Sequence, residues 1–172
     1  MSFAASTRIM LPDGSYETIQ NICNNPDITE VMSFNTNIRG LEPKPIFSRS
    51  VEDVDSDDWY HVYSISSGGI TSTLNLTSNH KIWVYSSEDF DTSTYTYAHG
   101  SYRQVTDVKN LVESHFPGYQ DVQFVSVSNA TPYMNLGVVV NFVHLSREFD
   151  HKYNLVIEGN HNFIANGIVV SE

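Results

Sequence analysis

The sequence has little cysteine and no long hydrophobic segment. Cys23 is the only cysteine, which excludes an internal disulfide and a cysteine-based metal cluster. Its neighbours Ile22 and Asn24 offer no group that would activate a thiol, so we expect a buried or inert side chain. No apolar run approaches the roughly 20 residues that a transmembrane helix requires, and we therefore expect no membrane partner.

Basic residues are also scarce. The chain has 9 Lys and Arg against 20 Asp and Glu, which gives a formal net charge of -11. Contacts with phosphates require clustered basic side chains, so nucleic acid is excluded as a partner. The 7 histidines are scattered and do not have the spacing of a structural metal site, so we expect no metal.

Alternating apolar and polar residues, punctuated by turn signals, indicate an all-β protein. Two short strands flank Pro12-Asp13-Gly14-Ser15, which is typical of a hairpin turn. Residues 59–65 and 73–77 flank a Gly-containing turn and predict a second hairpin. Further strands are expected at 31–34, 81–85, 123–127, 136–143, 153–157, 162–165 and 168–170.

Helical patterns are confined to two places. Residues 18–23 predict a single helical turn with Ile19 and Ile22 on one face, and residues 106–115 predict a longer helix. The acidic run 51–58 and the Ser- and Thr-rich stretch 86–101 are interpreted as loops. No repeat or linker divides the chain, so residues 1–172 are expected to form one all-β domain with one or two short helices.

Residues suited to peptide-bond chemistry lie near both ends of the chain. Ser2 supplies a hydroxyl nucleophile, and Thr77 and His80 stand three residues apart where a strand ends. A hydroxyl there can bind a carbonyl oxygen, and an imidazole can protonate a departing amide nitrogen. Near the other end His161 lies between two strands, before an Asn166-Gly167 turn. The pattern suggests a protein whose substrate is its own chain ends.

In this order the motifs resemble the splicing blocks of inteins. Residues 2–22 are similar to the N-terminal block, and residues 74–84, with Thr77-x-x-His80, to the second block. Residues 102–111 resemble the segment that precedes the usual endonuclease insertion. Residues 153–158, followed by 161–170, resemble the two C-terminal blocks, so the resemblance covers nearly the whole chain.

The resemblance implies the Hint fold, which inteins share with hedgehog autoprocessing domains. This fold is an all-β horseshoe with pseudo-two-fold symmetry that brings both chain ends into one cleft. We expect a monomeric mini-intein without a homing endonuclease, located in the cytoplasm with its host protein. Its partners would be its own flanking segments, the exteins, with Met1 as a flanking residue. Residues 86–120 would be the remnant of the insertion, or the site where a split form joins its complementary fragment.

The resemblance implies no metal or other cofactor, and it implies a role for four of the site residues. Ser2 would attack the carbonyl of Met1 and form an ester by an N–O acyl shift. Thr77 would polarise that carbonyl, and His80 would protonate the leaving amide nitrogen. His161 would assist the last cleavage, in which the terminal residue of the intein cyclises.

Four residues depart from the usual intein pattern. Ser2 stands in place of the usual cysteine, Asn154 in place of an aspartate, and Ser171 in place of a penultimate histidine. Glu172 stands in place of the terminal asparagine and lacks the amide nitrogen that closes an imide ring. We therefore predict that the chain does not splice as it stands. Either these residues were replaced to trap a precursor, or Ser2 and Ser171 are native and only Glu172 is altered.

Two alternatives remain open from the sequence. The first is a bacterial intein-like or hedgehog-type Hint domain that cleaves itself without ligating its flanks. The second is a non-enzymatic β-sandwich binding module, which would explain the alternation and the turns. It leaves unexplained why Ser2, Thr77, His80 and His161 fall at intein spacing.

Overall fold

The computed structural model describes residues 2–54, 58–66, 71–86, 90–94, 96–97, 100–113, 122–127, 134–145 and 149–172. Strands dominate these residues, and the two helices are short: α1 (Ile19–Asn24) and α2 (Val105–Glu113). The all-β prediction is therefore confirmed, together with both predicted helices. Within the described part of the chain, neither helix has the length and apolar character needed to cross a membrane.

Every predicted strand is present, together with four strands that the sequence did not predict. In chain order the strands are β1 (Arg8–Met10), β2 (Tyr16–Thr18), β3 (Glu30–Asn35), β4 (Gly40–Asp53), β5 (Trp59–Ser66), β6 (Thr71–Thr77), β7 (Lys81–Ser86), β8 (Phe90–Asp91), β9 (Thr96–Tyr97), β10 (Ser101–Gln104), β11 (Val122–Val127), β12 (Met134–Leu145), β13 (His151–Ile157), β14 (Asn162–Ala165) and β15 (Ile168–Ser171). The four that the sequence did not predict are β4, β8, β9 and β10.

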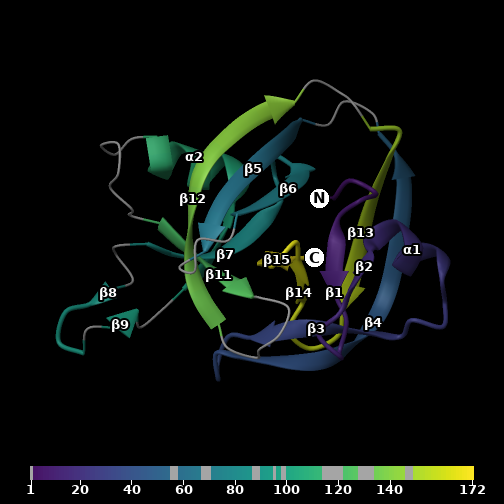
Figure 1. Ribbon diagram of the computed structural model, residues 1–172, viewed down its shortest axis with the longest axis horizontal. Helices are drawn as coiled ribbons and strands as arrows, with labels where there is room; N and C mark the ends of the chain where they lie inside the picture. Colours follow the sequence, from purple (N-terminus) through teal and green to yellow (C-terminus); the bar gives the residue numbers. More distant parts are fainter. Residues whose placement is uncertain are drawn as a thin grey trace.

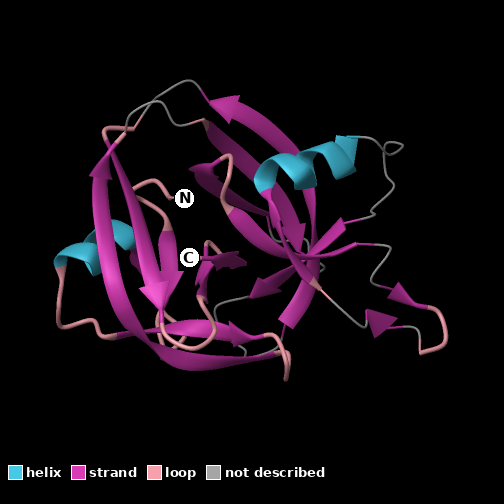
Figure 2. Ribbon diagram, turned by 180° about the vertical axis from the view of Figure 1, so that it is seen from behind, coloured by secondary structure: helices cyan, strands magenta, loops and turns pink. Residues whose placement is uncertain are grey.

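The strands form one large sheet and one small sheet around the two chain ends, and β8 and β9 form a separate two-stranded sheet. The large sheet has the order β2-β1-β14-β15-β7-β11-β12-β5-β6, with β10 paired to β7, and the small sheet has the order β13-β4-β3. Long curved strands surround the centre of the molecule, where both chain ends lie (Figure 1). The view from behind shows the same open arch, with one helix on each side (Figure 2).

An approximate two-fold relation connects the two halves of the arch. In each half a helix is followed by a strand that pairs with a long strand: β3 with β4 after α1, and β11 with β12 after α2. The strand after each long strand then pairs with the other long strand, so that β5 lies on β12 and β13 lies on β4. This reciprocal exchange matches the pseudo-two-fold horseshoe that the resemblance implied.

The N-terminal hairpin and α1 form as the sequence predicted. Gly14 adopts a φ of 86°, which is the left-handed conformation that the Asp-Gly turn requires. The Thr18 hydroxyl accepts the Asn21 amide hydrogen at 3.2 Å and caps α1. Ile19 and Ile22 are fully buried, so the one apolar face of this helix packs on the core.

The long strand β4 corrects the sequence-based prediction for residues 40–58. No strand was predicted between Gly40 and Ser50, and the loop predicted at 51–58 begins later, because β4 continues to Asp53. Pro43 and Pro45 lie in the half of β4 that pairs with β3 alone. A strand half with one partner tolerates residues that lack an amide hydrogen. Residues 55–57 lie outside the described residues.

The predicted loop at 86–101 also contains regular structure. Phe90 pairs with Tyr97 and Asp91 with Thr96, which makes the small β8–β9 ladder. Residues 87–89, 95 and 98–99 of this stretch lie outside the described residues, as do residues 114–120. The assignment of 86–120 as an insertion remnant or split site therefore stays a prediction. β5 and β6 pair as predicted, while residues 67–70 of their turn are outside the described part.

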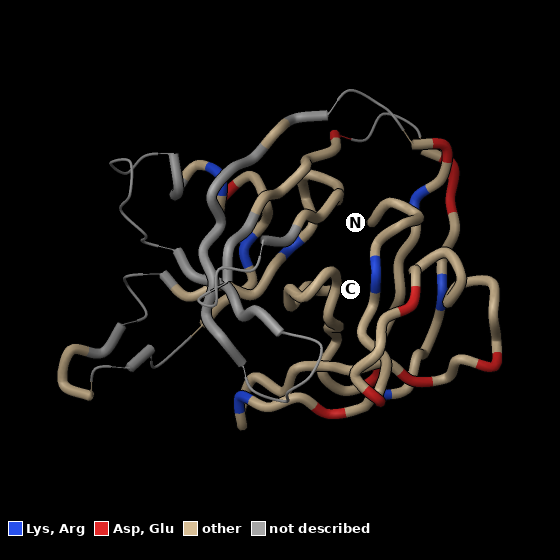
Figure 3. The backbone as a smooth tube through the Cα atoms, in the orientation of Figure 1, with Lys and Arg blue, Asp and Glu red and all other residues tan. Residues whose placement is uncertain are grey.

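Phe3 places the start of the chain inside the main hydrophobic core. Its side chain is fully buried, and its ring lies 5.5 Å from that of Phe163 on β14. Leu76, Tyr153 and Leu155 belong to the same buried cluster. Many acidic residues lie along β3, β4 and the loops beside them (Figure 3).

Candidate active site

Phe3 fixes the position of Ser2 because it pairs with strands on both sides. The Phe3 amide donates to the Tyr153 carbonyl at 2.8 Å, and the Tyr153 amide donates to the Phe3 carbonyl at 3.0 Å. On its other side Phe3 forms a bridge with Leu76 on β6. Chain ends usually fray unless they are tied into a sheet. Here the first residues form a tie between β6 and β13, and Ser2 is consequently held in place.

Ser2 and Thr77 hold each other through two hydrogen bonds. The Ser2 amide donates to the Thr77 hydroxyl oxygen at 3.0 Å, and the Thr77 amide donates to the Ser2 carbonyl at 3.0 Å. Both residues are buried. The Thr77 hydroxyl thus contacts the nitrogen of the peptide bond between residues 1 and 2. Among the described residues the Thr77 hydroxyl hydrogen has no acceptor, so it can be donated as the predicted role at the Met1 carbonyl requires.

His80 lies in the turn that follows Thr77 and is completely buried. Its amide donates to the Thr77 carbonyl at 3.0 Å, and its ring stacks against Phe3 with a centroid separation of 4.1 Å. Burial lowers the pKa of His80 to about 3, against the opposing effect of a hydrogen bond with Ser171, so the ring is neutral at pH 7.

The hydrogen bond of His80 determines its tautomer. Nε2 lies 2.5 Å from the carbonyl oxygen of Ser171. A carbonyl can only accept, so Nε2 carries the hydrogen and Nδ1 carries the lone pair. Nδ1 is buried and has no hydrogen-bond partner among the described residues. The ring therefore presents an unoccupied proton acceptor in the same site as Ser2 and Thr77.

The C-terminal residues complete the other side of the site. The Glu172 carboxylate accepts a hydrogen bond from the Ile157 amide at 2.7 Å and contacts Nδ1 of His161 at 2.9 Å. The Glu172 amide donates to the His161 carbonyl at 3.2 Å. The Ser171 hydroxyl donates to the Lys81 carbonyl at 3.2 Å. The structure thus brings His161, Ser171 and Glu172 together, and His80 joins them to the N-terminal group.

The turn at Asn166 and Gly167 helps to hold the two C-terminal strands in place. Their φ angles of 47° and 83° are those of the predicted type I′ turn. The Asn166 side chain accepts the Arg8 amide hydrogen at 2.7 Å and donates to the Thr73 carbonyl at 2.6 Å. The turn that joins β14 to β15 is therefore fastened to both β1 and β6.

Asn154 is the predicted site residue that the structure does not join to the others. Successive side chains of a strand point to opposite faces, and Asn154 stands between the buried residues Tyr153 and Leu155. Its Oδ1 atom is buried and has no hydrogen-bond partner in the described part of the chain. Its membership of the site stays a prediction.

Asn162 is a site residue that the sequence analysis did not single out. Its fully buried side chain donates to the Phe34 carbonyl at 2.8 Å and to the Tyr102 hydroxyl at 2.9 Å. Its Oδ1 accepts from the Phe34 amide at 2.8 Å and from the Ser33 hydroxyl at 2.7 Å. The only signal in the sequence was its position beside His161.

The Tyr102 hydroxyl accepts one of these hydrogen bonds from the Asn162 amide. Burial raises the pKa of its hydroxyl, a hydrogen bond from Asn162 acts in the opposite direction, and the charge of Glu172 raises the pKa further. The phenol is therefore protonated at neutral pH and lies within electrostatic reach of the terminal carboxylate.

The remaining polar groups of the described residues do not form a metal centre. Within the described ranges, no three His, Cys, Asp or Glu side chains are grouped in a way that would hold an ion. Cys23 is half-buried beside the Ser50 carbonyl, and burial raises the pKa of its thiol to about 11. This agrees with the prediction of an inert thiol.

Comparison with known proteins shows which fold the chain has. No protein-family model and no curated protein sequence matches the chain. Among solved structures, an intein from a hyperthermophile matches with a TM-score of 0.73 and 14% identity, over 99% of both chains. The DnaX mini intein from Spirulina platensis matches with a TM-score of 0.65 and 17% identity, over 100% of both chains.

The chain has the mini-intein fold. A bacterial intein-like domain from Clostridium thermocellum shares it, with a TM-score of 0.65 and 15% identity over 99% of this chain and 98% of that one. Because the matches run from end to end, the mini-intein fold accounts for the sequence without an endonuclease domain. The β-sandwich alternative is disfavoured, since the described strands form an open horseshoe.

Proposed function

We propose that the chain is an autocatalytic protein-splicing domain. It has the residues needed for the N-terminal step, and Glu172 blocks the C-terminal step. The observation that carries this proposal is the contact between His80 and the Ser171 carbonyl, which joins the residues of one chain end to those of the other. A site built from both ends is suited to reactions at the protein's own junctions.

In the N-terminal step, the Ser2 hydroxyl oxygen attacks the carbonyl carbon of Met1. The new carbon–oxygen bond makes an ester, and the bond from that carbon to the Ser2 nitrogen breaks. Nδ1 of His80 takes the hydroxyl proton and passes it to the departing nitrogen, which becomes the free amine of Ser2. Thr77 holds that nitrogen through its oxygen and donates its hydrogen to the carbonyl oxygen as negative charge develops.

In the C-terminal step of an intein, an amide nitrogen of the last side chain closes a ring on its own main-chain carbonyl. Glu172 has no such nitrogen. Its carboxylate is instead held by the Ile157 amide and by His161, in the place where the cyclising side chain would lie. We infer that this chain forms the ester but does not release its C-terminal flank by imide formation.

The natural partners in this proposal are the flanking exteins. A monomer suffices, because one chain contributes every residue of the site. The cellular location follows that of the host protein, for which the cytoplasm is our expectation.

A second function is favoured by Glu172 itself. If the ester at Ser2 is hydrolysed rather than transferred, the domain cleaves its N-terminal flank without ligation. The fold shared with the bacterial intein-like domain is consistent with this outcome.

The test is a precursor in which the full chain is fused between two folded reporter proteins, with a serine directly after position 172. Intact-mass analysis of the Glu172→Asn variant should show ligated reporters and a free domain. The Ser2→Ala, Glu172→Asn variant should show no ligation. The unaltered chain should show cleavage before Ser2 alone. Absence of cleavage at both junctions in the Glu172→Asn precursor would refute the proposal.

A further inference from the structure

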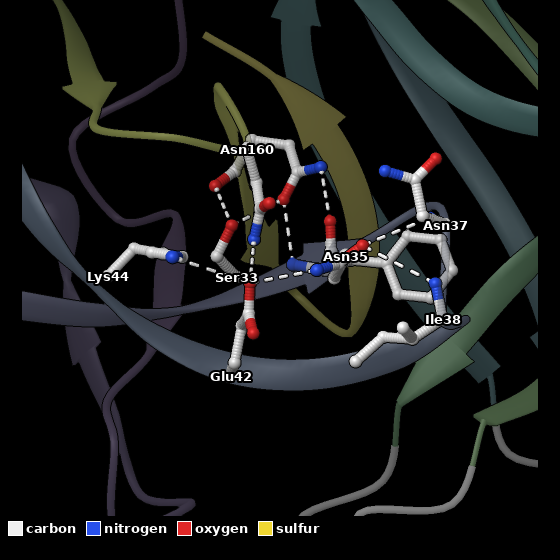
Figure 4. Close-up of polar contacts among 9 residues, drawn as sticks. Ser33, Asn35, Asn37, Ile38, Glu42, Lys44 and Asn160 are labelled. Carbon is white, nitrogen blue, oxygen red and sulfur yellow. Dashed lines mark hydrogen bonds and ion pairs between the residues drawn. The ribbon is translucent and has the colours of Figure 1, made fainter.

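His161 stands between two asparagines that the β3–β4 hairpin holds. On one side the Asn160 side chain donates to Glu42 at 2.9 Å, a contact drawn in Figure 4. On the other side the buried Asn162 amide exchanges two hydrogen bonds with the Phe34 backbone, each of 2.8 Å. Both neighbours of His161 are therefore anchored to the same hairpin, and its backbone has little freedom to move.

The backbone around His161 requires such anchors. Gly159 and His161 adopt φ angles of 78° and 56°, so the connection from β13 to β14 enters the left-handed region at both residues. Side-chain-bearing residues adopt this region at a cost and retain it where surrounding contacts enforce it. A Cβ on Gly159 would lie 3.4 Å from the Lys44 side chain, which shows how closely this connection packs on β4.

Glu42 is itself held in position by several donors. Besides Asn160, its carboxylate accepts from the Asn35 side chain at 3.2 Å and pairs with Lys44 at 3.5 Å (Figure 4). The Asn160 hydrogen bond, opposed by desolvation and aided by Asn35 and Lys44, lowers the pKa of Glu42. The carboxylate is ionised at neutral pH, and its bond to Asn160 is a charge-assisted one.

We propose that Glu42 is a positioning residue for the C-terminal cleavage, acting through Asn160 to hold His161 against the side chain of residue 172. The inference rests on the proposed function. His161 has an exposed ring, but its Nδ1 lies 2.9 Å from the Glu172 carboxylate. With an asparagine at position 172, the same placement presents the ring to the cyclising amide.

The first test measures hydrogen exchange in the full chain without flanking proteins. The exchange rates of two amides show how firmly residue 172 is held in place. The Ile157 amide donates to the Glu172 carboxylate, and the Glu172 amide donates to the His161 carbonyl. Glu42→Ala and Asn160→Ala should each accelerate their exchange about fivefold. Glu42→Gln, whose amide oxygen still accepts from Asn160, should restore the slow rates.

The matched control is Glu52→Ala, which removes a carboxylate from the same strand, one that pairs with Lys152 instead. It should leave both amides unchanged. Unchanged exchange in Glu42→Ala would overturn the inference, and so would equal acceleration of amides throughout β5 and β6. This measurement requires no splicing activity, so it decides the inference even if the proposed function fails.

The second test uses the Glu172→Asn precursor. Glu42→Ala should slow C-terminal cleavage about fivefold and leave cleavage before Ser2 at its original rate, and Glu42→Gln should restore the C-terminal rate. Equal slowing at both junctions would indicate general destabilisation and would contradict a positioning role. No cleavage by the parent precursor would instead count against the proposed function.

Discussion

The imidazole Nε2 of His80 lies 2.5 Å from the main-chain carbonyl oxygen of Ser171. The contact spans 91 positions of sequence and joins the two ends of the chain inside one buried site. It also fixes the neutral tautomer of His80, whose buried Nδ1 has no hydrogen-bond partner among the described residues. A residue of the turn after β6 is thereby joined to β15, the last strand of the chain.

Thr77 should matter to the acyl shift more than to folding. Thr77→Val keeps the shape of the side chain but removes the oxygen that accepts the Ser2 amide hydrogen. We expect hydroxylamine-induced cleavage before Ser2 to fall about a hundredfold, as when one donor to a developing oxyanion is lost. Thr73→Val, on the exposed part of the same strand, is the control and should cleave normally. A normal rate in Thr77→Val would contradict this role.

His80 should make the protein less stable in mild acid. Its pKa is about 3 in the folded chain and 6.5 ordinarily, so below pH 6.5 the unfolded chain binds a proton that the folded chain does not. Stability therefore falls as the pH drops, by about 2 kcal/mol from this group between pH 7 and 5. Urea unfolding at both pH values should show this loss reduced by that amount in His80→Gln. Equal losses in both proteins would show that His80 is not buried in its neutral form.

Cys23 should react slowly with thiol reagents until the protein unfolds. Burial raises the pKa of its thiol from 9.0 to about 11, and the thiolate is the reactive form. At pH 8 we expect labelling by a disulfide reagent to be about a hundredfold slower in the folded chain than in urea, from the two-unit difference in pKa. Equal rates in both states would contradict the placement of this side chain.

Asn162 should be important for stability as well as for the site. Asn162→Ala leaves the amide and carbonyl of Phe34 buried without their partners. We expect the free energy of unfolding to decrease by about 3 kcal/mol, measured in urea at pH 7. Asn37→Ala, at an exposed turn position, should change it by less than about 0.5 kcal/mol. Similar effects of the two substitutions would argue against the buried network.

Most strands were predictable because their alternation reflects one buried face. β4 was not, because Pro43 and Pro45 read as breakers in a sequence. Their tolerance depends on their half of β4 having β3 as its single partner, and that is a property of the sheet. The charged residues at the end of β4 were interpreted as a loop for a similar reason, since their pairing with β13 is long-range.

The resemblance predicted which residues form the site, but not the contacts that bring them together. The sequence identified Ser2, Thr77 and His80, while their meeting depends on Phe3, which bridges two strands. The polar residues that hold the loop around His161 carried no motif. Glu42 and Asn160 are 118 positions apart, so their contact follows from the fold alone.

The formation of an ester at Ser2 can be tested in one measurement. The unaltered chain, fused between two reporter proteins, is treated with hydroxylamine and analysed by intact-mass spectrometry. We expect the N-terminal reporter to be released with Met1 as its last residue and in hydroxamate form, while Glu172 stays joined to the C-terminal reporter; Ser2→Ala should release nothing. An intact precursor, or equal release from the Ser2→Ala protein, would contradict a splicing domain with Ser2 as its nucleophile.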